Sequence, residues 1–250
     1  MEKIISVDKI SVQYGQNKIL HDISFAIDKG DFIGLAGPNG AGKTTLVKAI
    51  LGLLPIAKGT ITIFGIPQRS FTGFSKIGYL PQKHTGINNL FPASVKEIVA
   101  LGLLSSKKPP RNLSHTDWHK VTTALHELDI IDLQDKMISE LSGGQQQKVL
   151  LARAIVAKPE LLIFDEPSTA LDPESRNEFF TLVQKFNKEK GLTVILITHD
   201  TGYIGSYANK LLYIDHKLIH FGPIADFCKK DATAACFEKI GEHVVWHQHT

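Results

Sequence analysis

Cysteine, methionine and tryptophan are scarce in this chain of 250 residues, which contains two of each. The cysteines, Cys228 and Cys236, are too few for a disulfide framework, as is typical of a protein in a reducing compartment. No apolar run approaches the roughly 20 residues of a membrane-spanning helix, and the first residues, MEKII, lack the apolar core of a secretory signal. We therefore expect a cytosolic protein that reaches a membrane only through a partner.

A strong excess of charge of one sign is also missing. Lysine and arginine number 28, aspartate and glutamate 25, and the net charge is +3. So small an excess does not indicate a nucleic-acid partner. The hydrophobic fraction of 43% and the charged fraction of 21% are those of a folded globular chain, which excludes disorder.

Hydrophobic patterning predicts an α/β fold. We expect strands at 4–12, 19–27, 31–36, 59–64, 76–80, 161–164, 192–198, 210–214 and 217–221, and helices at 43–53, 94–104, 115–128 and 173–190. The first strands suggest an antiparallel β subdomain, and the continuous apolar runs suggest a buried parallel sheet. We place the main domain at 1–225, with a helical subdomain inserted at about 83–147, and a tail at 226–250.

A glycine-rich loop lies between the strand predicted at 31–36 and the helix predicted at 43–53. It reads GPNGAGKTT and contains G-x-x-x-x-G-K-T in the strand–loop–helix setting of a phosphate loop. Glycines let main-chain N–H groups surround anionic oxygens, the lysine can reach the β- and γ-phosphates, and the first threonine can bind Mg²⁺. The predicted nucleotide-binding residues are Gly37, Pro38, Asn39, Gly40, Ala41, Gly42, Lys43, Thr44 and Thr45.

Two adjacent acids end the apolar strand at 161–164, within the segment LLIFDEP. Asp165 is a candidate Mg²⁺ ligand, and Glu166 can polarise the attacking water. Taken alone, the pair could equally be a solvated strand end.

A second helix start suited to anions occurs at 141–145. The segment LSGGQ places Ser142 as the helix cap before two glycines whose N–H groups are exposed. One phosphate loop binds one nucleotide, so a second such helix start in the same chain calls for a separate explanation.

The set GPNGAGKTT, LSGGQ and LLIFDEP, in this order, resembles the nucleotide-binding subunit of an ATP-binding cassette (ABC) transporter over about 4–221. The resemblance implies a P-loop NTPase with a RecA-like parallel-sheet core. It implies that Tyr14 stacks on adenine, that Gln82 links Mg²⁺ and the attacking water to the helical insertion, and that His199 contacts the γ-phosphate. Taken singly, these residues could also be a turn aromatic, a surface amide and a strand-end histidine.

The same resemblance implies a head-to-tail homodimer. The signature segment of one copy (Leu141, Ser142, Gly143, Gly144 and Gln145) would close over ATP in the other, and Asp172 in STALD would contact the second copy. The implied catalytic residues are Glu166, His199 and Gln82, and the implied Mg²⁺ ligands are Thr44, Gln82 and Asp165. Lys148 stands where such families often have arginine, and we expect a minor effect.

The resemblance also implies integral membrane permease subunits as partners, which would hold the chain at the cytoplasmic face of the membrane. A cytoplasmic helix of the permease would dock along 83–99, with Asn88, Asn89 and Phe91 as contacts or merely as packing residues. No nucleic-acid partner is expected.

The cargo implied by the resemblance is zinc or manganese, delivered by an extracellular metal-binding protein. His243, His247 and His249 in the tail could sense metal, with Cys236 as a further ligand, or belong to a plain polar terminus. The alternatives are an importer ATPase for iron chelate or cobalamin, a soluble ABC ATPase acting on DNA or ribosomes, and a non-hydrolytic regulatory cassette.

Overall fold

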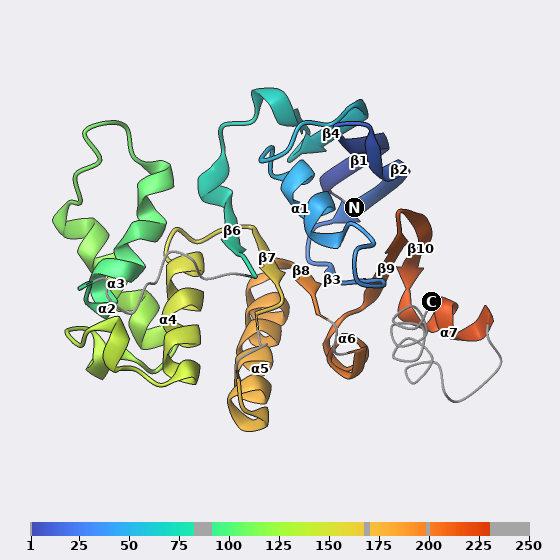
Figure 1. Cartoon of the computed structure of the whole chain (residues 1–250). Coiled ribbons are helices and arrows are strands. Elements are labelled where there is room, and N and C mark those ends of the chain that lie inside the picture. The colour runs from blue at the N-terminus through green and yellow to red at the C-terminus, as the bar shows by residue number, and fades with distance from the viewer. Residues whose placement is uncertain (1, 83–91, 168–170, 199–200, 231–250) are drawn as a thin grey trace. The chain divides into compact units, whose positions relative to one another are not determined.

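Figure 1 shows the computed structural model of the chain, which describes residues 2–82, 92–167, 171–198 and 201–230. The chain packs as two compact units, Met1–Thr72 with Thr193–Thr250 and Gly73–Leu192. Among the described residues, no helix is both long and apolar enough to cross a membrane.

An antiparallel sheet of order β2-β1-β4-β5 opens the first unit. β1 (Lys3–Tyr14) and β2 (Asn17–Asp28) form a hairpin, β4 (Lys58–Ile63) lies on the other side of β1, and β5 (Ile66–Pro67) is short. The burial alternation of β1 shifts at an irregularity between Val7 and Ile10. Such a bulge keeps apolar residues on the covered face along a long strand.

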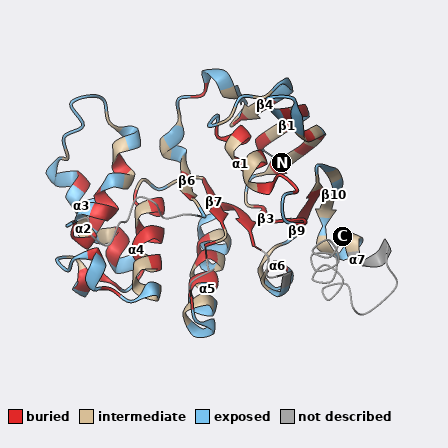
Figure 2. Cartoon of the chain, in the orientation of Figure 1, coloured by how far each residue is buried: buried red, intermediate tan, exposed pale blue. Residues whose placement is uncertain are grey.

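The remaining strands of the first unit follow the order β10-β9-β3-β8. β3 (Phe32–Ala36) is parallel to both β8 (Thr193–Ile197) and β9 (Lys210–Asp215), and β10 (Lys217–Pro223) returns antiparallel. Every residue of β3 and β8 is buried (Figure 2). This is the pattern of parallel strands covered on both faces. The helical elements of this unit are α1 (Lys43–Ile50), η1 (Gln68–Ser70), α6 (Thr201–Tyr207) and α7 (Ile224–Lys230).

The second unit combines a parallel strand pair with helices. β6 (Ile77–Leu80) runs parallel to β7 (Leu161–Asp165). The helices are α2 (Val95–Ala100), α3 (His115–Glu127), α4 (Gly143–Ile155) and α5 (Pro173–Lys190), with 3-10 turns η2 (Phe74–Lys76), η3 (Leu101–Ser106), η4 (Ile131–Leu133) and η5 (Ile138–Glu140). α4 is central, because it contacts α2, α3, α5 and β6.

The predicted α/β class, with an antiparallel N-terminal sheet and buried parallel strands, is confirmed. The helix expected at 94–104 is shorter than predicted, because α2 ends at Ala100 and the chain continues as the 3-10 turn η3. Gly102 lies in that turn, and glycine is a poor helix former. The pattern missed β5 and α6, because one has two residues and the other has two glycines within seven.

Our first prediction concerns the crossing of α4 and β6 at Gly78. A Cβ atom there would lie 2.4 Å from Leu162 Cδ2 and 2.6 Å from the Ala154 carbonyl oxygen. A main-chain carbonyl cannot rotate away, so the helix and the strand would have to separate. We expect Gly78→Ala to lower the free energy of unfolding in urea by about 1–3 kcal/mol. The exposed Thr60→Ala is the control, and equal unfolding midpoints for the two variants would contradict this packing.

Candidate functional site

The phosphate loop (37–45) connects β3 to α1, as predicted. Gly37, Gly40 and Gly42 have φ values of +149°, +81° and +94°, in the region that favours glycine. Gly37 also lies against β9, where a Cβ atom would be 2.0 Å from the Ile214 carbonyl oxygen. Gly42 caps α1 without a side-chain acceptor, so the first N–H groups of the helix remain directed at the loop.

Lys43 lies inside this loop. Its side chain is buried, and its Nζ donates to the carbonyl oxygens of Gly37 and Pro38 at 2.8 Å each. Both of these acceptors are neutral main-chain oxygens of the phosphate loop itself. Such a cation is suited to a phosphate oxygen, with which it forms a charge-assisted hydrogen bond. Thr44 and Thr45 follow in the first turn of α1.

A hairpin turn supports the phosphate loop, and no sequence motif predicts this contact. The N–H of His216 donates to the Ala41 carbonyl at 3.2 Å, and its Nδ1 lies 3.0 Å from the Ile19 carbonyl oxygen. His216 adopts a φ of +55° between β9 and β10. An isolated histidine in a predicted hairpin is unremarkable, so only the fold reveals that this turn supports the loop.

Tyr14 ends β1 beside a turn, opposite Asn17. Its side chain is 51% exposed, so the ring offers a face for stacking. Its proposed contact with adenine stays a prediction.

Gln82 and Glu166 meet in the second unit. Gln82 Nε2 donates to Glu166 Oε2 at 2.5 Å, which brings together two of the predicted catalytic residues. Glu166 follows the buried Asp165 and has a φ of +53°. Left-handed backbone at a residue other than glycine is strained, and such strain clusters at functional sites.

The negative charge of Asp165 affects the pKa of Tyr79. Burial of the phenol, and secondly the negative charge of Asp165, raise the pKa of Tyr79 to about 12. Tyr79 lies in β6 opposite Ile163, two residues before Asp165 in the neighbouring strand. Asp165 itself is 1% exposed, so its carboxyl group is buried at the end of β7. Carboxylate oxygens in such a place suit a hard divalent cation such as Mg²⁺.

The signature segment begins α4, and Ser142 caps the helix as predicted. Ser142 Oγ accepts from the Gln145 N–H at 3.3 Å, and Gln145 Oε1 accepts from the Ser142 N–H at 3.1 Å. This reciprocal capping box uses two of the N–H groups at the helix start. Gly143 and Gly144 then occupy the first two helical positions, where N–H groups have no acceptor within the helix.

Asp172 caps the neighbouring helix α5. Its Oδ1 accepts from the Ser175 N–H at 3.0 Å, and this backbone hydrogen bond is the main cause that lowers the pKa of Asp172. Lys148, the noted departure from the family pattern, pairs with Glu178 of α5 at 2.6 Å.

Several predicted residues lie outside the described part of the chain. These are His199, residues 168–170 of STALD, Asn88, Asn89, Phe91, and the tail residues Cys236, His243, His247 and His249. Their proposed roles stay predictions. Within the described residues, no group of three histidine, cysteine, aspartate or glutamate side chains is placed to hold a metal ion.

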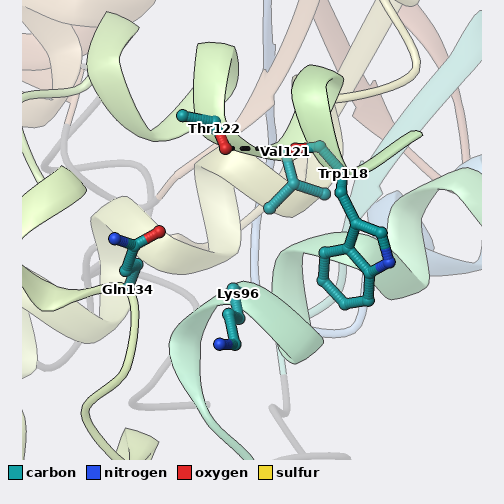
Figure 3. Close-up of a pocket in the computed structure, with 5 residues that line it drawn as sticks. All are labelled: Lys96, Trp118, Val121, Thr122 and Gln134. Carbon is teal, nitrogen blue, oxygen red and sulfur yellow. Dashed lines mark hydrogen bonds between the residues drawn. The ribbon is translucent and has the colours of Figure 1, made fainter. Parts of the chain in front are cut away.

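A cavity of about 310 Å³ lies among α2, α3 and the segment before η5. Figure 3 shows its lining, which is Lys96 from α2, Trp118, Val121 and Thr122 from α3, and Gln134. We call this cavity the α2–α3 groove. Val95, Ile98 and Val99, which lie within the expected docking segment 83–99, are buried in the core of the unit. Of the described part of 83–99, Lys96 is the residue that lines the groove.

A phosphate loop after a buried strand, with a second buried strand ending in acids, defines the class of P-loop nucleoside triphosphatases. Comparison with family models assigns the chain to one family within this class. Residues 20–169 match the family model described as ABC transporter. The chain therefore belongs to the ABC transporter family and carries its ATPase domain.

Similar proteins and solved structures agree with this family assignment. The chain is 40% identical over 227 residues to the zinc uptake system ATP-binding protein ZurA of Listeria innocua, covering 91% of this chain and 88% of that protein. It is 36% identical over 219 residues to the manganese transport system ATP-binding protein MntB of Bacillus subtilis, covering 88% and 86%. A dimeric bacterial ABC transporter cassette superimposes with a TM-score of 0.75 at 25% identity, covering 88% of this chain and 98% of that one.

The contact between Gln82 and Glu166 generates the second prediction. Gln82→Ala removes the amide that orients the carboxylate, so we expect kcat for ATP hydrolysis to fall about ten- to a hundredfold with little change in KM. Because both residues act through one hydrogen bond, Gln82→Ala should cost little in a Glu166→Gln background. The control is Gln68→Ala in η1, which removes an amide that donates to the Ala49 carbonyl oxygen of α1. Additive losses in the double variant would contradict the pairing.

Proposed function

We propose that this chain is the ATPase subunit that energises a membrane permease for the import of a divalent transition metal, zinc or manganese. The observation that carries the ATPase part is the phosphate loop with Lys43 buried inside it, bound to two loop carbonyls. The metal cargo is supported by the names of the relatives, a zinc uptake and a manganese transport ATP-binding protein.

Different residues bind ATP and promote its hydrolysis in this proposal. The loop N–H groups and Lys43 bind the β- and γ-phosphates, and Tyr14 stacks on the base. Thr44, Asp165 and Gln82 would hold Mg²⁺, which when bound supplies positive charge against the phosphates. Glu166 orients and polarises the water that attacks the γ-phosphorus as the bond to ADP breaks. Gln82, by its hydrogen bond, fixes the direction of that carboxylate.

Two copies act together in this proposal. The signature segment of one copy closes on the ATP of the other, and Asp172 lies at the same interface. The exposed helix start at Gly143 and Gly144 offers N–H groups to an anion from outside the chain. The dimeric state of a similar cassette supports this arrangement.

The permease docks in the α2–α3 groove. Trp118 is 37% exposed there, beside the buried Val121, so the groove offers an apolar floor with an aromatic wall (Figure 3). A short cytoplasmic helix with an apolar face fits such a site. Docking would hold the chain at the cytoplasmic face of the membrane, while an extracellular metal-binding protein delivers the cargo to the permease.

The third prediction separates ATP binding from hydrolysis. Glu166→Gln keeps the phosphate loop intact but removes the carboxylate that polarises water. We expect ATP binding to persist, hydrolysis to fall at least a hundredfold, and a dimer to accumulate with ATP in analytical ultracentrifugation. A monomeric Glu166→Gln chain that hydrolyses ATP at the wild-type rate would overturn this mechanism.

The fourth prediction tests the groove. Trp118→Ala removes the aromatic wall, so we expect less permease to copurify from native membranes while the ATPase rate of the isolated chain is unchanged. Phe74→Ala is the matched control, since Phe74 is 43% exposed in the same unit but does not line the groove. Equal permease recovery with both variants would exclude the groove as the docking site. Recovery of ribosomal or DNA-repair proteins instead would move the chain to the soluble class.

A further inference from the structure

The starts of α4 and α5 touch along one narrow line of contacts. A Cβ atom on Gly144 would lie 2.8 Å from Ser175 Oγ, so the main chain of α4 approaches the Ser175 side chain closely there. One turn further along α4, Lys148 Nζ lies 2.6 Å from Glu178 Oε1 of α5. Positions 144 and 148 share one face of α4, and positions 175 and 178 share one face of α5. We call these two contacts the α4–α5 seam.

The lining of this end of the seam is mostly polar. A cavity of about 120 Å³ is lined there by Ser142, Gly144, Gln145, Lys148, Ser175, Glu178 and one apolar residue, Phe179. The Lys148 side chain is 19% exposed and the Glu178 side chain 56%. The ion pair therefore lies at a cavity with a mostly polar lining. A mostly buried lysine paired with a carboxylate is held more firmly than an exposed pair.

Both helix starts joined by the seam carry residues of the proposed dimer interface. Ser142 caps α4 and begins the signature helix, while Asp172 caps α5. The orientation of the α4 start relative to the α5 start determines whether both can contact a second copy of the chain at the same time. A two-point contact fixes that orientation better than the Gly144–Ser175 approach alone, because one contact still permits rotation about it.

We propose that Glu178 is a positioning residue for ATP-dependent dimer formation: through its ion pair with Lys148 it holds the signature helix start in register with the start of α5. This inference rests on the proposed dimeric ATPase function. The partner surface is a second copy of this chain carrying ATP. The opposite role, in which Glu178 restrains Lys148 from binding phosphate, is disfavoured because the Lys148 side chain is largely buried against α5.

The fifth prediction uses dimerisation as its readout. In the Glu166→Gln background, we expect Glu178→Gln and Lys148→Met each to raise the ATP concentration for half-maximal dimer formation about five- to tenfold. In the otherwise wild-type chain, KM for ATP should rise by a similar factor, with kcat at saturating ATP little changed. Binding of fluorescent ADP to the single chain should be unchanged, because the phosphate loop is untouched.

The controls separate positioning from general destabilisation. Glu189→Gln removes an exposed carboxylate from the far end of α5 and should behave as the parent. Lys148→Arg keeps a cation for Glu178 and should preserve dimer formation, and the double variant Lys148→Met with Glu178→Gln should be no worse than the worse single variant.

The inference alone would be overturned if Glu178→Gln formed dimers at the same ATP concentration as Glu189→Gln, or at a lower concentration. Failure of the Glu166→Gln parent to dimerise with ATP would instead overturn the proposed function, and the inference would fall with it.

Discussion

The short parallel strands of this protein are buried on both faces, and this burial determines where its charged and hydrogen-bonding groups can lie. β3, β7 and β8 have five residues each, and every one of those residues is buried. A polar side chain within such a strand would need a partner in the interior or cost several kcal/mol. Charged and hydrogen-bonding groups therefore gather where the strands end. The phosphate loop follows β3, and Asp165 with Glu166 ends β7.

The two groups of polar residues differ in how their charge is supported. Lys43 donates to two main-chain carbonyl oxygens of the phosphate loop, and these bonds hold its ammonium inside that loop. Asp165 is a buried acid at the end of β7, and carboxylate oxygens are ligands that a divalent cation prefers. Glu166 is turned by a left-handed backbone toward Gln82. One strand end thus suits phosphate, whereas the other suits a metal and a water molecule.

Most strands, the long helices and the phosphate loop were predictable because each has a local cause. Alternation marks β1 and β2, continuous apolar runs mark β7 and β8, and GPNGAGKTT needs no distant residue to be recognised. The contacts that support the site were not predictable. His216 braces Ala41, and Glu178 pairs with Lys148, across 175 and 30 positions of sequence, and no local pattern encodes a partner at that distance. The α2–α3 groove was not predictable for the same reason, since its lining combines residue 96 with residues 118–134.

Packing joins the α2–α3 groove to the Gln82–Glu166 pair. The groove is built on α2 and α3, both helices contact α4, and α4 contacts β6, which leads into Gln82. Closely packed elements move as bodies rather than deforming continuously. An occupant that binds one arrangement of these helices better than another must therefore shift the population of arrangements around Gln82. Because such linkage is reciprocal, a nucleotide state that favours one arrangement must change the affinity of the groove by the same factor. A single packed unit that contains both the groove and the Gln82–Glu166 hydrogen bond is enough to make the proposed permease docking and the ATP chemistry depend on each other.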